Sequence, residues 1–143
     1  MNSEDNKTLA RRFIEEVFVR QDEAAADRLA AADFTPHSWP GVEPGVANLK
    51  AGMKRVSKGL TDVWMKIEDV VAKGDKVAVR LSAHAVQSGE FMGLPPSGKA
   101  YTVPEMHVFR VKDGKVAEHW SNVDMLGIMQ QLGALPNPSK KAA

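Results

Sequence analysis

Apolar side chains recur at helical spacing in three segments of the first half of the chain. Within residues 5–21 they fall three or four positions apart on one stripe, which predicts an amphipathic helix. Asp22 is a favourable N-cap for a second, alanine-rich helix, which we expect to end before Phe34. A third helix is predicted over residues 46–59, although Gly52 lowers its helix propensity.

The second half alternates apolar and polar residues at the spacing typical of β-strands. The predicted strands are 63–73, 76–86, 100–112 and 115–123. The turn pair Gly74-Asp75 joins the first two strands into a hairpin. Asp113-Gly114 joins the last two, because this pair supplies the positive φ angles of a type I′ turn. Residues 90–99, rich in glycine and proline, are expected to form a loop.

A short last helix is predicted from Asp124, with Gly133 where a helix stop belongs. The order of three helices, four strands and one helix favours an α+β fold, with the helices on one face of an antiparallel sheet. The chain of 143 residues suits one domain, which we assign to residues 3–135. Residues 136–143 lack apolar periodicity and are expected to be a flexible tail.

Composition excludes several classes of function. Nineteen basic and 18 acidic residues give a net charge of +1, which provides no overall attraction for nucleic acid or an anionic membrane. The absence of cysteine removes disulfides and thiolate nucleophiles and fits a reducing compartment. The N-terminal stretch has no apolar core typical of a signal peptide, and no 18 apolar residues run together. We therefore expect a cytoplasmic protein.

The register of the second hairpin predicts a chemically mixed sheet face. A two-residue turn places His107 opposite Trp120 and Glu105 opposite Asn122. Aromatic, imidazole, carboxylate and amide groups on one face are typical of a small-molecule pocket. The opposite face would carry Met106, Val108, Arg110, Ala117, His119 and Ser121.

The same reasoning applied to the first hairpin places Asp69 opposite Arg80 and Met65 opposite His84. A carboxylate and a guanidinium directly opposite each other on a sheet form a routine stabilising pair. We therefore interpret Asp69 and Arg80 as structural.

Three stretches together carry a family resemblance: GEFMGLPPSGK (89–99), VFRVKDGKVAEHW (108–120) and NVDMLGIMQQLG (122–133). In this order and spacing they resemble the SnoaL-like polyketide cyclases, or ester cyclases, of the NTF2-like superfamily. The resemblance extends over nearly the whole chain. It implies a cone in which helices close over a curved sheet around a deep pocket, and a homodimer formed through the outer sheet face.

The resemblance also implies a reaction. An aspartate at the position of Asp124 is the general acid and base of an intramolecular aldol ring closure in family members, which use neither a metal nor a cofactor. Family members commonly carry a histidine in the stretch 87–91, where this chain has Gln87.

Asp124 has two interpretations from physical chemistry. A carboxylate inside an apolar cone is desolvated, which raises its pKa and suits it to proton transfer. Aspartate is also a preferred N-cap, and Asp124 stands where the last helix begins. The two roles are compatible with each other.

His107 is the second catalytic candidate, as a hydrogen-bond donor to a developing enolate, and its alternative is a core histidine. Glu105 either pairs with His107 and orients it or acts as a second acid. The other candidates for substrate binding are His37, Trp39, His84, Phe91, Trp120 and Asn122. Each of these has an ordinary core or loop role as its alternative.

The sequence lacks the patterns of other chemistries. The four histidines show no H-x-H or H-x-x-x-H spacing, so no metal site is expected. GLPPSGK lacks Walker spacing, and there is no G-x-S-x-G elbow. The leading hypothesis is a cofactor-free, polyketide-cyclase-like enzyme for a hydrophobic carbonyl substrate. The alternatives are a proton-transfer enzyme of the isomerase or epoxide hydrolase type and a non-catalytic protein that binds a hydrophobic small molecule.

A homodimer is expected through one face of the second hairpin, because both faces carry apolar groups and one of them lines the pocket. The residues assigned to this contact are Met106, Val108, Ala117, Ser121 and Val123.

Overall fold

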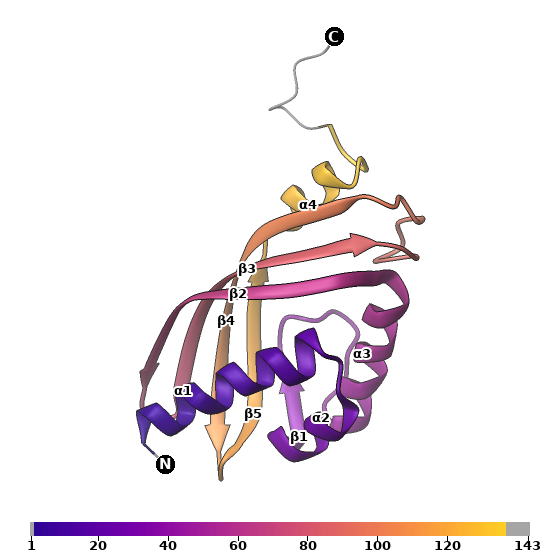
Figure 1. Cartoon of the computed structure of the whole chain (residues 1–143). Helices are drawn as coiled ribbons and strands as arrows, with labels where there is room; N and C mark the ends of the chain where they lie inside the picture. Colours follow the sequence, from indigo (N-terminus) through magenta and orange to yellow (C-terminus); the bar gives the residue numbers. More distant parts are fainter. Residues whose placement is uncertain (1, 137–143) are drawn as a thin grey trace.

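The computed structural model describes residues 2–136, so most of the predicted tail lies outside the described residues. The elements are α1 (Ser3–Arg12), the π-helix η1 (Phe13–Val19), α2 (Glu23–Leu29), β1 (Ala30–Pro36), α3 (Val46–Gly59), β2 (Leu60–Lys73), β3 (Lys76–Gln87), β4 (Ala100–Lys112), β5 (Lys115–Val123) and α4 (Met125–Gln131). Among them, no helix is long and apolar enough to cross a membrane. The expected α+β arrangement is confirmed, with helices packed on one side of a curved sheet (Figure 1).

The helices form close to where the periodicity predicts them. The first predicted helix is α1 continued by η1, and Asp22 caps α2 by accepting hydrogen bonds from the amides of Ala24 and Ala25. In η1 the i→i+5 hydrogen bonds bring residues five apart to one side. The rings of Phe13 and Phe18 consequently meet, with centroids 5.2 Å apart.

Strand β1 was not predicted. The second helix ends at Leu29, and the next seven residues form β1, which pairs with β5 in parallel and gives the sheet order β1-β5-β4-β3-β2. The sheet is therefore mixed and not wholly antiparallel. The expectation was wrong because three consecutive alanines, Ala30 to Ala32, favour helix locally, whereas pairing with β5 decides their conformation.

Both predicted hairpins are present. Asp113 and Gly114 have φ angles of 51° and 74°, as a type I′ turn requires. Asp69 lies opposite Arg80, with the carboxylate 2.7 Å from the guanidinium, which confirms that pair. The side chains are exposed, so the pair contributes little to stability.

The predicted register of the second hairpin is wrong beyond the first two residue pairs, because β5 contains a bulge. Val111 pairs with Val116, but Arg110 pairs with Glu118, so Ala117 is an extra residue. Downstream of Ala117, every β5 side chain points to the face opposite the one expected. The observed partners are His107 with Ser121, Glu105 with Val123, Val108 with Trp120, Met106 with Asn122 and Phe109 with His119.

A bulge in β2 likewise changes the predicted register of the first hairpin. The register shifts between Ile67 and Asp69, so His84 pairs with Trp64, and Met65 pairs with Ala83 and not with His84 as expected.

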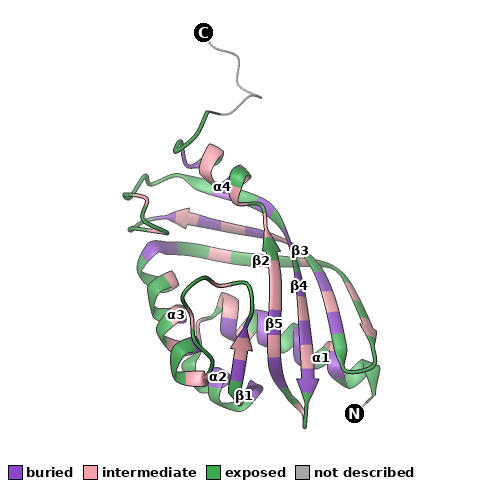
Figure 2. Cartoon of the chain, turned by 180° about the vertical axis from the view of Figure 1, so that it is seen from behind, coloured by how far each residue is buried: buried purple, intermediate pink, exposed green. Residues whose placement is uncertain are grey.

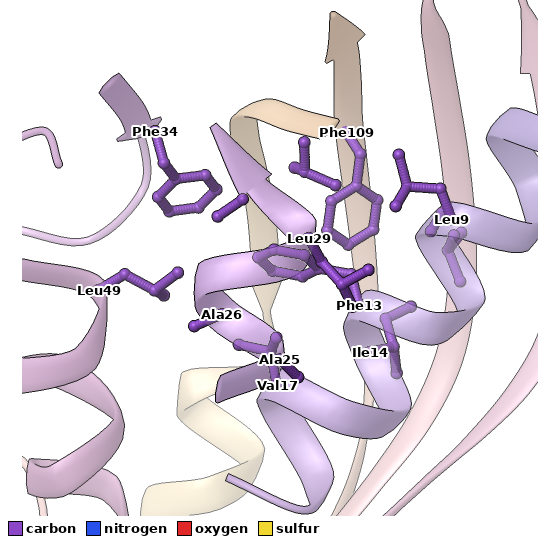
Figure 3. Packing of buried hydrophobic residues seen from close by; sticks show 14 of the residues in the cluster. Leu9, Phe13, Ile14, Val17, Ala25, Ala26, Leu29, Phe34, Leu49 and Phe109 are labelled. Carbon is purple, nitrogen blue, oxygen red and sulfur yellow. The ribbon is translucent and has the colours of Figure 1, made fainter. Parts of the chain in front are cut away.

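The helix-covered side of the sheet, called the inner face here, carries the odd-numbered residues of β3 and β4. The largest buried cluster joins these residues to α1, η1 and α2. Phe13 lies near its centre, with its ring 5.7 Å from Phe34 and 5.6 Å from Phe109 (Figure 3). A second cluster, including Tyr101, packs α4 onto the same face.

The other side, called the outer face here, carries the even-numbered residues of β3 and β4. The view from behind shows β3, β4 and β5 in front of α1 (Figure 2). The residues expected at a dimer contact are therefore divided between faces. Met106 and Val108 are on the outer face, whereas Ala117 is buried and Ser121 and Val123 pair with inner-face residues.

Candidate functional site

A chain of three hydrogen-bonded titratable side chains crosses the inner face. Nε2 of His107 lies 2.8 Å from Oε1 of Glu105, and Nδ1 of His107 lies 2.8 Å from Nε2 of His119. Exposure increases along the chain, from 0 % at His119 through 4 % at His107 to 7 % at Glu105. The expectation that Glu105 pairs with His107 is confirmed.

The bulge in β5 explains this arrangement. His119 was predicted on the face opposite His107, and the extra residue Ala117 turns it to the same face. Sequence reasoning missed His119 for this reason. The signal that could have found it is the pair Val116-Ala117, because two adjacent apolar residues interrupt the alternation.

Aromatic rings cover the two histidines of this hydrogen-bonded group. Phe18 of η1 lies 5.7 Å from His107 and 5.3 Å from His119, measured between ring centroids. Trp39, in the connection between β1 and α3, lies 5.1 Å from His119. The π-helical turn thus places an aromatic ring directly on the buried polar groups.

Burial controls the electrostatics of this face. It lowers the pKa of His119 well below the ordinary value of 6.5, with smaller contributions from His107 and His37. Burial, reinforced by the charge of Glu105, raises the pKa of Tyr101 to about 12. His119 and Tyr101 are therefore both neutral at physiological pH.

Asp124 is the N-cap of α4. Its Oδ1 accepts a hydrogen bond from the amide of Gly127 at 2.9 Å, and the side chain is exposed. The cap interpretation is therefore confirmed. The backbone amide of Asp124 donates to the carbonyl of Pro104.

The position of α4 brings Asp124 to the Glu105 end of the inner face. Asp124 directly follows Val123, which is the strand partner of Glu105. Farther along α4, the side-chain amide of Gln131 bonds to both the N–H and the C=O of Thr102, as a neighbouring strand would.

Four residues predicted to line the pocket lie away from this site: His37, His84, Trp120 and Asn122. Trp120 and His37 stack outside the inner face, with centroids 4.7 Å apart, and His37 lies 2.8 Å from Glu118. Asn122 is exposed opposite the outer-face residue Met106.

His84 also lies on the outer face, where it stacks on Trp64 at 5.0 Å and contacts Thr102 at 2.9 Å. His84 was expected opposite Met65, and the bulge in the first hairpin places it opposite Trp64 instead.

Phe91 lies in the loop that joins β3 to β4, and Gln87 is the last residue of β3. Phe91 packs against Tyr101 in the second cluster. Gln87 is fully buried, donates to the carbonyls of Leu94 and Pro95, and accepts from Ser97. The Gln87 side chain thus anchors this loop to the end of β3.

Two hollows lie away from these hydrogen-bonded titratable groups. One of about 450 Å³ lies near Asp27, Gly45 and Lys115, and one of about 300 Å³ lies near Asn6 and Gly114. Over the residues that the structure describes, no three histidine, aspartate or glutamate side chains are grouped as metal ligands would be.

Comparison with known proteins identifies the family. The model of the SnoaL-like polyketide cyclases matches residues 8–132. The chain belongs to this family. Its matches to curated relatives cover a shorter segment. It is 32 % identical over 60 residues to aklanonic acid methyl ester cyclase DnrD of Streptomyces peucetius. It is 30 % identical over 61 residues to nogalonic acid methyl ester cyclase of Streptomyces nogalater.

These matches span 42 % and 43 % of this SnoaL-like chain, and 41 % and 46 % of the two relatives. Solved structures resemble it over far more of its length. TsrD of Streptomyces laurentii is 28 % identical, with a TM-score of 0.86 over 94 % of this chain and 99 % of that one. IdmH of Streptomyces antibioticus is 26 % identical, with a TM-score of 0.77 over 90 % and 98 %. The chain thus has the NTF2-like α+β fold of its family.

Proposed function

We propose that this SnoaL-like protein is an enzyme that closes a ring in a hydrophobic, polyketide-like ester by an aldol-type reaction, using side chains alone. The observation that carries the proposal is a buried carboxylate–imidazole pair at the end of the inner face where Asp124 begins α4. Family membership supports the ring closure, since the similar curated proteins are named as methyl ester cyclases.

Asp124 is the proton-transfer group of the proposal. Its cap bond to Gly127 fixes one carboxylate oxygen, and the other oxygen takes the proton from a carbon between two carbonyls. The electron pair of the broken C–H bond gives an enolate, whose carbon attacks a second carbonyl. The alkoxide that results takes the proton back from Asp124, so the ring closes without net proton exchange.

His107 is the second group of the proposal. Both of its ring nitrogens have protein partners, Glu105 and His119, so in this arrangement neither is free to donate to an enolate. His107 acts by orienting Glu105 toward the substrate. We expect His107→Ala to lower turnover by a factor comparable with that of an Asp124 variant or smaller.

The test is Asp124→Asn, assayed on an aryl β-keto ester that can cyclise. Asparagine caps helices as well as aspartate but is no base, so turnover should fall by roughly 10²- to 10⁴-fold while the melting temperature changes little. Asp22→Asn is the matched control, because Asp22 caps α2 in the same way at a distant position. Unchanged turnover in Asp124→Asn would refute the role of Asp124.

The same assay separates the alternative functions. A non-catalytic binding protein would bind the ester without converting it in any variant. An isomerase or a hydrolase would depend on Asp124 but give a product without a new carbon–carbon bond, which mass spectrometry and NMR of the product distinguish.

A further inference from the structure

The proton positions in the buried chain follow from its end groups. An ionised carboxylate only accepts hydrogen bonds, so His107 donates to Glu105 from Nε2. With its proton on Nε2, His107 accepts at Nδ1, and His119 donates to it from Nε2. The remaining nitrogen, Nδ1 of His119, is buried and has no hydrogen-bond partner among the described residues.

In this tautomer each histidine donates a hydrogen bond toward Glu105. His119 is the buried end of the group, and burial beneath Phe18 and Trp39 keeps it neutral. The more exposed end is Glu105, where Oε1 is held by His107 and where no hydrogen bond to Oε2 is found in the described part of the chain. One carboxylate oxygen is thus oriented by the protein and the other is left for a ligand.

The strand partners of Glu105 on both sides are apolar. They are Leu81 of β3 and Val123 of β5. Tyr101 lies on the same face of the same strand, and the charge of Glu105 contributes to the raised pKa of Tyr101. Oε2 of Glu105 is not among the buried atoms that lack a partner in the described residues, so solvent reaches it and a ligand that donates a hydrogen bond can replace that solvent.

We infer that Glu105 is the specificity-determining residue of the site, that it accepts a hydrogen bond from a hydroxyl group of the substrate, and that His119 positions it through His107. The inference rests on the proposed function and narrows its substrate class to carbonyl compounds that also carry a hydroxyl group. A ketone or ether oxygen in the same place would face a carboxylate that cannot donate.

The test uses two ligands that differ in one group: an aryl β-keto ester with a phenolic hydroxyl and its O-methyl ether. We expect kcat/KM to favour the hydroxyl compound by roughly 10- to 100-fold, because the ether leaves the carboxylate oxygen unpaired. Glu105→Gln should reduce this preference to within about threefold, since an amide both donates and accepts. Equal kcat/KM values for the two compounds in the natural protein would overturn the inference.

Glu118→Gln is the matched control for Glu105→Gln. Glu118 also lies 2.8 Å from a histidine, His37, but outside the inner face. The preference for the hydroxyl compound should remain in this variant. A loss of preference equal to that of Glu105→Gln would contradict the inference.

The role of His119 has its own readout. His119→Gln retains an Nε2 donor for His107, whereas His119→Met retains bulk without a donor. The ¹⁵N shifts of His107 should report the Nε2–H tautomer in the natural protein and in His119→Gln, and a changed tautomer mixture in His119→Met. The hydroxyl preference should follow the tautomer, and an unchanged tautomer in His119→Met would refute the positioning role.

Failure of the proposed function can be distinguished from failure of this inference. The α,α-dimethyl analogues of both esters cannot form an enolate, and their binding by calorimetry requires no catalysis. If neither ester is converted but the hydroxyl analogue binds more tightly than its ether, the inference stands and the cyclase proposal fails. Equal binding of both analogues would contradict the inference itself.

Discussion

The carboxylate of Asp124 lies over Gly127, with its Oδ1 2.9 Å from the Gly127 amide nitrogen. A Cβ atom at position 127 would come within 2.9 Å of Cγ of Asp124, closer than such atoms pack. Glycine at this position therefore leaves the space that the Asp124 carboxylate occupies, and its φ angle is not the reason for it.

Gly127→Ala should accordingly move the Asp124 carboxylate. We expect turnover to fall by at least about tenfold, since a displaced acid–base group loses its alignment. Stability should change little, because alanine favours the helix by about 0.8–1 kcal/mol and offsets part of the disturbed cap. Turnover and thermal unfolding of the variant check this prediction.

Gly52→Ala is the control for that variant. A Cβ at Gly52 of α3 would meet the Arg55 guanidinium at 3.6 Å, an ordinary contact. This variant should be stabilised by about 0.5–1 kcal/mol and retain full turnover. If both variants kept full turnover, the packing of Asp124 on Gly127 would have no catalytic consequence.

Local patterns predicted most elements because their signals are local. Residues 46–59 and 100–112 have the bounds that periodicity indicates, and Asp22 and Asp124 cap the helices that follow them. Strand β1 escaped prediction because its alanines prefer helix and only the distant β5 makes them a strand.

The candidate site was predicted less well because it depends on register. Glu105 and His107 share a strand, so their common face followed from alternation alone. His119 and Trp120 exchanged faces because one inserted residue, Ala117, lies between them and the turn. A bulge is decided by packing on both sheet faces, which a turn motif does not encode.

His119 predicts a pH dependence of stability. Burial lowers the pKa of folded His119, whereas the unfolded chain takes up a proton near the ordinary value of 6.5. Below that pH the unfolded state binds more protons, so the free energy of unfolding should decrease by up to about 1.4 kcal/mol per pH unit. Above it this contribution is fully retained. Urea unfolding of the natural protein and of His119→Gln measures the difference.

The informative window lies between pH 6.5 and about 4.5. Below 4.5, protonation of Glu118, whose pKa is lowered mainly by its hydrogen bond from Arg110, adds a further loss of stability. Within the window, His119→Gln should show a shallower slope than the natural protein. Identical slopes would mean that His119 takes up a proton in the folded state.

The exposed apolar residues of the outer face predict a homodimer whose contact residues differ from those expected from the sequence. Met106 is 58 % exposed and Trp64 44 %, and Val108 and Trp120 lie on the same side. Apolar exposure of this kind on one sheet face favours association with a second copy. We expect the natural protein to sediment as a dimer at micromolar concentration and Met106→Glu to sediment as a monomer.

Leu126→Glu is the control for the dimer prediction, because Leu126 is 59 % exposed but lies on α4. This variant should remain dimeric. A natural protein that sediments as a monomer would contradict the prediction, as would a Met106→Glu variant that stays dimeric.

The bulge at Ala117 makes the face of each later β5 side chain depend on one residue that has no partner. Loss of the bulge at unchanged length would pair Arg110 with Ala117, bring Trp120 into the core and expel His119. Deletion of Ala117 would instead leave Arg110 opposite Glu118 and Phe109 opposite His119, so His119 would stay on the inner face. Evolution of this strand can therefore shorten it by that residue and keep the buried chain of Glu105, His107 and His119, whereas a substitution that lets Ala117 pair with Arg110 would dismantle the buried chain in one step.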